Sequence, residues 1–194
     1  MTVVLSEIPV EVSPRRLAAK AELPVEKVTC FLSKAGSVLR PAGIFDEVEP
    51  VEALGRSEDT WGKTVIIGLC TLGQGVAGRI GKSTGRWNLW DSLSKVALSD
   101  TLDYLEYRVR LFLKPFGRDT GDRLIPGCRE LPLEANRLIL DHFKAEESMG
   151  IQVQSSGEID SRIGFAFLYT TADRTGDKPG RCDHCSRMDC PAKL

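Results

Sequence analysis

Apolar positions along the first quarter of the chain predict two short helices and two strands. A Ser-Pro pair at residues 13–14 predicts a helix up to about residue 21, because serine caps a helix and proline suits its first turn. Apolar residues recur at helical spacing from 25 to 39 and predict a second helix. Residues 3–12 and 44–54 have strand character, and Pro50 is expected to restrict the second to an edge or an interrupted strand.

The middle of the chain contains the two strongest periodic signals. The apolar run Val65–Cys70 predicts a central strand. From residue 89 to residue 113 apolar positions repeat at approximately helical spacing, which predicts the longest helix and the spine of the core. The stretch from 114 to 128 is rich in charge and glycine, and we expect a loop there.

The last part of the chain predicts one more helix and two strands. A helix is expected from Pro132 to about Met149, where Gly150 closes it, with strands at 151–155 and 163–170. Helices and strands do not alternate in a steady βαβ rhythm. The sequence therefore predicts an α+β fold with a mixed or antiparallel twisted sheet and long helices.

Composition excludes several classes of partner. A net charge of −1 over 194 residues gives no basic field for nucleic acid. The first twelve residues lack the basic and continuous apolar regions of a signal peptide, and no stretch approaches the length of a membrane span. Six cysteines, three of them crowded into the tail, are more typical of metal binding in a reducing compartment than of a disulfide framework. We therefore expect a cytoplasmic protein.

The C-terminal tail carries the clearest chemical motif. Cys182, Cys185 and Cys190 have C-x2-C-x4-C spacing, with Pro191 directly after the third. Thiolates at this spacing can converge on one soft metal centre, and a proline follows a cluster cysteine in bacterial ferredoxins. The tail has few apolar residues, so a metal would be needed to fold it. We interpret it as a knuckle that supplies three ligands of a [4Fe–4S] cluster; a zinc site and a solvated tail are the alternatives.

A glycine pattern after the central strand raises a second hypothesis. Gly73, Gly75 and Gly78 match G-x-G-x-x-G, which in a dinucleotide site is followed by a parallel strand ending in an acidic residue. The acidic residue at that distance, Asp91, falls in the long predicted helix. Close packing between a helix and a strand is therefore the favoured explanation of these glycines.

A family resemblance begins at Arg123. The run Arg123-Leu-Ile-Pro126-Gly127-Cys128, followed by a helix, resembles the Arg-x-x-Pro-Gly-Tyr stretch of the reactivation domain of cobalamin-dependent methionine synthase, which binds S-adenosylmethionine. Residues 66–73, 99–106 and 150–153 resemble its strand ending in Thr-Leu-Gly, its long helix with a conspicuous glutamate, and the strand after the motif helix. The resemblance covers roughly residues 44–190, and some stand-alone relatives also end in a short cysteine knuckle.

The resemblance implies Arg123, Pro126 and Gly127 as residues that bind S-adenosylmethionine. The guanidinium fork of Arg123 suits a carboxylate, although a salt bridge to Asp119 or Asp122 is the plain alternative. For Glu106 on the long helix, a solvated or capping role is the favoured interpretation, and a functional role is the alternative.

The sequence departs from the family pattern where the tyrosine is replaced by Cys128. This change removes part of the S-adenosylmethionine motif and supplies a fourth thiol, so we predict Cys128 as the remaining cluster ligand; a small buried residue is the alternative. Cys30 and Cys70 lie in apolar contexts and are expected in the core.

These observations predict an activation-domain-like body, residues 1–172, and a linker with a cysteine knuckle, residues 173–194, that packs back on it. The resemblance implies an accessory protein in the reductive activation or remethylation of a corrinoid methyl carrier, within a cobalamin-dependent methyltransferase system. An iron–sulfur cluster would supply electron transfer, and cobalamin would come with the partner protein. The alternative function is a zinc-knuckle interaction module without turnover.

Overall fold

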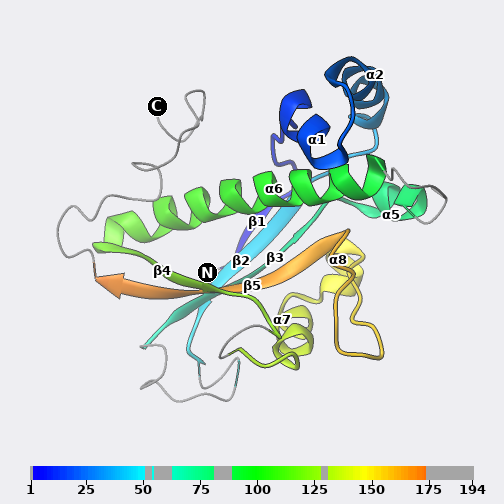
Figure 1. Cartoon of the computed structure of the whole chain (residues 1–194). Coiled ribbons are helices and arrows are strands. Elements are labelled where there is room, and N and C mark those ends of the chain that lie inside the picture. Colours follow the sequence, from blue (N-terminus) through cyan, green and yellow to red (C-terminus); the bar gives the residue numbers. More distant parts are fainter. Residues whose placement is uncertain (1, 51–53, 55–62, 81–88, 128–130, 174–194) are drawn as a thin grey trace.

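The computed structural model describes residues 2–50, 54, 63–80, 89–127 and 131–173, and Figure 1 shows one sheet between two helical layers. The sheet has five strands in the order β1-β2-β3-β5-β4, and every neighbouring pair is antiparallel. The strands are β1 (Val3–Leu5), β2 (Ala42–Val48), β3 (Val65–Thr71), β4 (Arg118–Leu124) and β5 (Gly164–Asp173). The α+β class is confirmed, and of the two expected sheet types the antiparallel one is found.

The predicted central strand is the centre of this sheet. All seven residues of β3 are buried, and β3 pairs with β2 on one side and β5 on the other. The edge position expected for the preceding strand is wrong, because β2 lies between β1 and β3. That strand ends at Val48, so Pro50 lies outside the hydrogen-bonded ladder and does not interrupt it.

One face of the sheet is covered by α6 (Leu89–Leu113), which has the predicted bounds. Glycines let this helix and the sheet pack closely: a Cβ atom on Gly43 would lie 2.6 Å from Leu105 Cδ2. Around α6 lie α1 (Pro14–Ala21), α2 (Val25–Ala35) and α5 (Gln74–Ile80). The predicted cap of α1 is confirmed, since the Ser13 side chain accepts from the Arg16 amide.

The opposite face is covered by two short helices in place of the single helix expected up to residue 149. They are α7 (Ala135–Phe143) and α8 (Ala145–Met149), and Lys144 between them has φ +48°. This left-handed residue ends the α7 ladder and changes the direction of the chain. The strand expected at 151–155 is reduced to one bridge between Val153 and Ile159.

The expectation of a loop from 114 to 128 is wrong over most of its length. A single 3-10 turn, η1 (Lys114–Phe116), ends α6, and Gly117 at φ +69° leads into β4. β4 is an edge strand, and edge strands commonly carry charged side chains, which explains its polar sequence. Gly121 falls where the register with β5 shifts between Thr120 and Arg123.

The dinucleotide hypothesis is not supported by this topology. No strand in the described ranges runs parallel to β3, and Asp91 lies in the first turn of α6. The glycines do not show packing between a helix and a strand: Gly73 has φ +86°, a Cβ atom on Gly75 would lie 3.0 Å from Val38 Cγ1 in the turn after α2, and nothing lies within 4 Å of a Cβ atom on Gly78. Within the described part of the chain, no helix combines the length and apolarity needed to cross a membrane.

Candidate functional site

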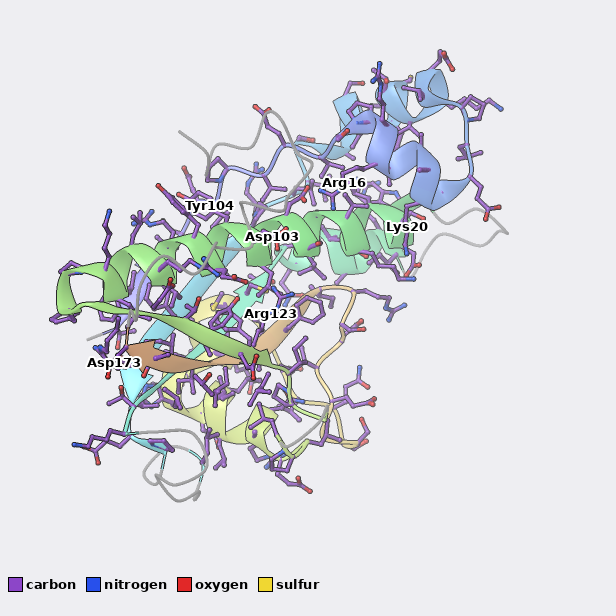
Figure 2. All side chains as sticks on the ribbon, turned by 60° about the vertical axis from the view of Figure 1, so that its left-hand side comes forward. Arg16, Lys20, Asp103, Tyr104, Arg123 and Asp173 are labelled. Atoms are coloured by element: carbon purple, nitrogen blue, oxygen red, sulfur yellow. The ribbon has the colours of Figure 1, made fainter. Side chains whose placement is uncertain are left out.

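Arg123 lies on β4 and faces α6. Its register partner on β5 is Tyr169, and the side chain is 25% exposed. The guanidinium Nη1 lies 3.5 Å from Glu106 Oε2 and 4.0 Å from Asp103 Oδ1; Asp103 and Arg123 face each other in Figure 2. The salt bridges to Asp119 or Asp122 considered from the sequence are therefore wrong, because both described partners of Arg123 come from the helix.

Glu106 is the centre of this polar cluster. Its Oε1 accepts from Arg110 Nη2 at 3.0 Å, and its Oε2 accepts from the Tyr169 hydroxyl at 3.3 Å. The Glu106 side chain is 13% exposed, and residue 106 lies in the interior of α6, so neither a solvated nor a capping role is correct. Sequence reasoning named Arg123 and Glu106 separately and missed Tyr169. The structure brings all three together.

Electrostatics inside the cluster favour a neutral Tyr169. Burial raises the pKa of Tyr169, and the negative charge of Glu106 raises it further, while Arg123 opposes the shift. Partial desolvation also raises the pKa of Asp103, with Asp100 and Glu106 acting in the same direction and Arg123 against it. Because the Asp103 side chain is 59% exposed, water screens these charges and the effect on stability is small.

The guanidinium of Arg123 has spare hydrogen-bonding capacity. Its Nη1 atom is buried and has no hydrogen-bond acceptor among the described residues, although carboxylates lie within ion-pair distance. Arginine presents five donors in a rigid fork that matches a carboxylate. Glu106 and Asp103 already offset the charge of this guanidinium, so an anionic ligand would have to bind to its other nitrogens or displace one of the two carboxylates.

Pro126 and Gly127 form the turn by which the chain leaves β4 for α7. Gly127 has φ +84°, where glycine is favoured, and its amide donates to the Leu131 carbonyl at 2.9 Å. This bond joins the two ends of the segment that carries Cys128. The sulfur of Cys128 and those of Cys182, Cys185 and Cys190 belong to parts of the chain outside the described residues.

The two described cysteines, Cys30 and Cys70, differ in burial. Cys70 is fully buried in β3, as expected, and burial raises the pKa of its thiol to about 12. A neutral thiol is a poor metal ligand, because the thiolate is the species that binds. Cys30 is exposed on α2, so the expectation that it lies in the core is wrong. In the described ranges no three His, Cys, Asp or Glu side chains are grouped to hold a metal.

The point from which the tail starts is well defined. β5 ends at Asp173, whose register partner is Arg118 at the start of β4. Arg118 is fixed by an ion pair with Glu47 and a 2.9 Å hydrogen bond to Thr64 Oγ1. The tail therefore starts at one end of β4, and the Pro126-Gly127 turn lies beyond the other end.

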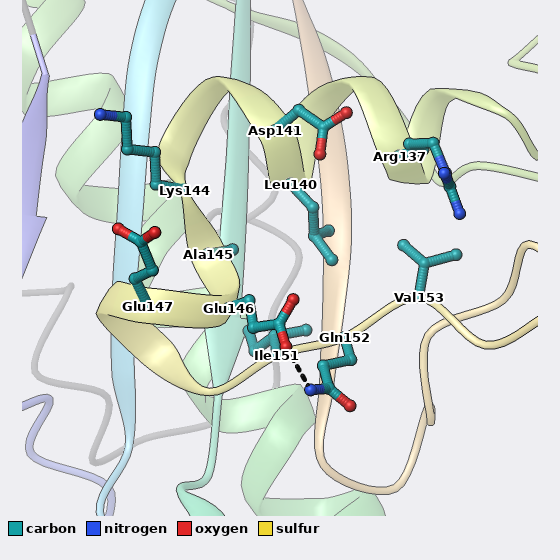
Figure 3. A pocket seen from close by; sticks show the side chains of 10 residues that line it. All are labelled: Arg137, Leu140, Asp141, Lys144, Ala145, Glu146, Glu147, Ile151, Gln152 and Val153. Carbon is teal, nitrogen blue, oxygen red and sulfur yellow. Dashed lines mark hydrogen bonds between the residues drawn. The ribbon is translucent and has the colours of Figure 1, made fainter.

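A groove lies on the opposite side of the molecule. It has a volume of about 840 Å³ and is lined by α7, α8 and the segment after them, as Figure 3 shows. Leu140, Ala145 and Ile151 are its buried apolar residues, and Gln152 Nε2 donates to Glu146 Oε1 at 2.5 Å. Arg123, Pro126 and Gly127, the described residues among those predicted to bind a cofactor or metal, do not line this groove.

Comparison with known proteins adds no family assignment. No protein-family model matches the chain, and no significant match was found among curated proteins. Function is therefore argued from the site itself.

Proposed function

We propose that this protein is an iron–sulfur accessory protein, similar to the activation domain of methionine synthase, that acts in reductive activation or remethylation of a corrinoid methyl carrier. The supporting observation is the meeting of Glu106 and Arg123 at 3.5 Å. The two residues come from different segments that each resemble that domain. Their convergence on one face of the sheet is what a shared binding site requires.

The α6–β4 cluster would bind the methyl donor. Arg123 would hold the carboxylate of S-adenosylmethionine through the guanidinium nitrogens other than Nη1. Nη1 faces Glu106 and Asp103, which keep the guanidinium oriented. S-adenosylmethionine has an amino group as well as a carboxylate, and the carboxylates of Glu106 and Asp103 would suit that amino group.

The cluster ligands would be Cys128 and the three tail cysteines. Four thiolates match the donor set of a [4Fe–4S] cluster, which supplies one-electron chemistry that protein side chains lack. The high pKa of Cys70 argues against that residue as the fourth ligand. Cys128 directly follows Gly127 in the sequence, and the Gly127 amide donates to the Leu131 carbonyl.

The length of the linker between Asp173 and Cys182 sets a condition on this ligand assignment. Nine residue steps separate Asp173 from Cys182, which corresponds to roughly 30 Å at full extension. Travelling back along β5 from Asp173 to Leu168, the partner of Leu124, takes about 17 Å. The remaining length has to cover the distance to Cys128, so the assignment requires a largely extended linker.

Cysteine variants test the proposal with a control inside the chain. Cys185→Ser should remove stoichiometric metal, and Cys128→Ala should give a three-iron or labile cluster visible by electron paramagnetic resonance. Cys30→Ala, which changes an exposed thiol, should leave the spectrum unchanged. Full metal content in Cys185→Ser, or an unchanged spectrum in Cys128→Ala, would refute the ligand set. Colourless protein with one zinc would instead support the zinc-knuckle module.

The proposal implies a corrinoid protein or a cobalamin-dependent methyltransferase as partner, and the cysteine usage favours the cytoplasm. Co-purification with a corrinoid protein, retained in the wild type and lost on Arg123→Ala or Cys128→Ala, would support this partnership.

A further inference from the structure

We propose that α1 and α2 form a helix-turn-helix that binds duplex DNA, with α2 in the major groove. DNA binding would be separate from the corrinoid chemistry proposed above. The two helices pack against each other and lie on the side of α6 that faces away from the sheet, as Figure 1 shows. Their turn, their exposed surface and their charge each point to this role.

The turn between the helices has the form that this motif requires. Glu22, Leu23 and Pro24 separate α1 from α2. Glu22 has φ +54°, which is unusual for a residue other than glycine, and its amide donates to the Ala18 carbonyl where α1 ends. A helix-turn-helix has a sharp turn of about three or four residues that often contains glycine. The left-handed Glu22 takes the place of that glycine.

The inner face of the helix pair fixes α2 to the rest of the protein. Val28 on α2 is fully buried, and the ring of Phe31 packs edge-on against Trp90 with ring centroids 5.0 Å apart. Arg16 on α1 forms an ion pair with Asp100 on α6. α2 is therefore held with one face against the core and the other face turned outward.

The outer face of α2 is polar and has the dimensions of a recognition helix. Its exposed residues are Glu26, Lys27, Thr29, Cys30, Ser33 and Lys34. A helix of 11 residues is about 16 Å long, and the major groove, about 12 Å wide, admits one α-helix. In that groove lysine binds guanine or a neighbouring phosphate, glutamate accepts from the cytosine amino group, and a hydroxyl can bind any base.

The segment that carries the motif is basic, although the whole chain is not. Residues 13–40 contain six lysines and arginines and two glutamates, a net charge of +4, against −1 for all 194 residues. All six basic residues are exposed. Positive charge at this density attracts phosphates and supplies a large share of the affinity for DNA. The net charge of the whole chain, an average over all segments, therefore does not exclude nucleic acid at this one.

Binding of a short fluorescein-labelled DNA duplex of random sequence, followed by anisotropy, tests the role of these charges. Lys27→Ala and Lys34→Ala should each weaken binding about five- to tenfold at low salt and lower the slope of log K against log salt by about one. Arg137→Ala is the matched control, because it removes one exposed charge from α7 and should change neither quantity. Absence of binding by the wild type at low salt, or equal losses in all three variants, would overturn the proposal.

The thiol of Cys30 reports whether DNA covers α2, because it is exposed on the outer face. With the duplex at ten times its Kd about one-tenth of the protein is free, so alkylation of Cys30 by N-ethylmaleimide should be about tenfold slower. Mass spectrometry of the peptides measures that rate. An RNA duplex of the same sequence should not protect Cys30, since the major groove of A-form RNA is too narrow for a helix. Unprotected Cys30 in DNA-bound protein, or equal protection by RNA, would overturn docking in the major groove.

Metal content separates this proposal from the iron–sulfur assignment. Lys27→Ala and Lys34→Ala should keep the metal content and the urea stability of the wild type, because both side chains are exposed. Loss of metal in these variants would place the lysines in the iron–sulfur assembly and overturn a separate DNA site. Metal retained in Cys185→Ser would overturn only the cluster.

Discussion

The two faces of the sheet are built from similar aliphatic side chains but differ in what else they bury. The α7–α8 face packs Ile67, Leu69, Ile139 and Leu168 against one another, and it also buries the carboxylate of Asp46, which lies 3.3 Å from His142 Nε2 on α7. Under α6, the other face encloses a carboxylate, two arginines and a tyrosine hydroxyl. Buried charge is expensive to desolvate and is weak evidence for stability. The larger polar cluster under α6 is the reason that we propose this face, and not the α7–α8 face, for binding.

The largest expected effect concerns packing on the α6 face. Gly68→Ala would place Cβ 2.4 Å from Phe167 Cζ and 2.8 Å from the Ile44 carbonyl oxygen, and the backbone oxygen cannot move aside. We expect a loss of about 3 kcal/mol in the free energy of unfolding, measured with urea. Gly78→Ala is the control, because nothing lies within 4 Å of its Cβ in α5 and alanine favours a helix by about 1 kcal/mol. Equal effects at the two glycines would show that the close packing is wrong.

The binding role of the α6 face is tested by removing one arginine from each face. Arg123→Ala should weaken S-adenosylmethionine binding by about 1.5–3 kcal/mol in calorimetry, as for a hydrogen bond to a charged group. Arg137→Ala, in the groove below the other face, should leave the affinity unchanged. Absence of any binding heat in the wild type would instead mean that replacement of the family tyrosine by Cys128 has abolished the site.

Alkaline pH should destabilise the α6 face in particular. Cys70 and Tyr169 are both in the core under α6, and both have a raised pKa in the folded state. A group with a raised folded pKa stabilises the fold fully below its unfolded pKa, and that contribution is lost as the pH rises toward the folded value. The free energy of unfolding should therefore fall on the order of 1–2 kcal/mol between pH 8 and pH 10, mainly through Cys70.

Two variants separate this effect from general alkaline unfolding. In Cys70→Ala the decrease from pH 8 to pH 10 should shrink, and in Tyr169→Phe the change should be confined to higher pH. Urea titrations at each pH measure both. A decrease of the same size in wild type and Cys70→Ala would show that the thiol does not carry it.

The smallest effect belongs to the α7–α8 face. Lys144 has φ +48°, a left-handed conformation that glycine adopts without a steric penalty. Lys144→Gly should therefore raise the free energy of unfolding by up to about 1 kcal/mol and leave ligand binding and metal content unchanged. A destabilised protein would mean that contacts of the Lys144 side chain outweigh the backbone conformation.

Elements specified by local sequence were predicted well. The α6 helix was predicted with its observed bounds because apolar residues repeat through all of its turns, and α1 because Ser13 and Pro14 act within one turn. β4 was missed because its stability comes from pairing with β5, whose paired residues are 44 to 55 positions away in the sequence. As an edge strand, β4 shows no apolar pattern of its own. The break at Lys144 was missed because nothing in the sequence marks a lysine as left-handed.

The candidate site was predicted in part, for the same reason. Arg123 was recognised from a motif, but its partners come from a helix and a strand distant in sequence. Tyr169 did leave a signal: it alternates with Phe165 and Phe167 along β5 and therefore lies on the same buried face. A buried tyrosine needs a hydrogen-bond partner, and this need points to a polar group such as Glu106 on the covering helix.

The central claim, an iron–sulfur cluster held by the tail and Cys128, is tested most directly by the iron, acid-labile sulfide and zinc content of the full-length protein purified without oxygen. The account predicts about four irons and four sulfides per chain, brown protein and negligible zinc. One zinc per chain with no sulfide, or protein without metal whose tail is cleaved as readily as that of Cys185→Ser, would contradict it.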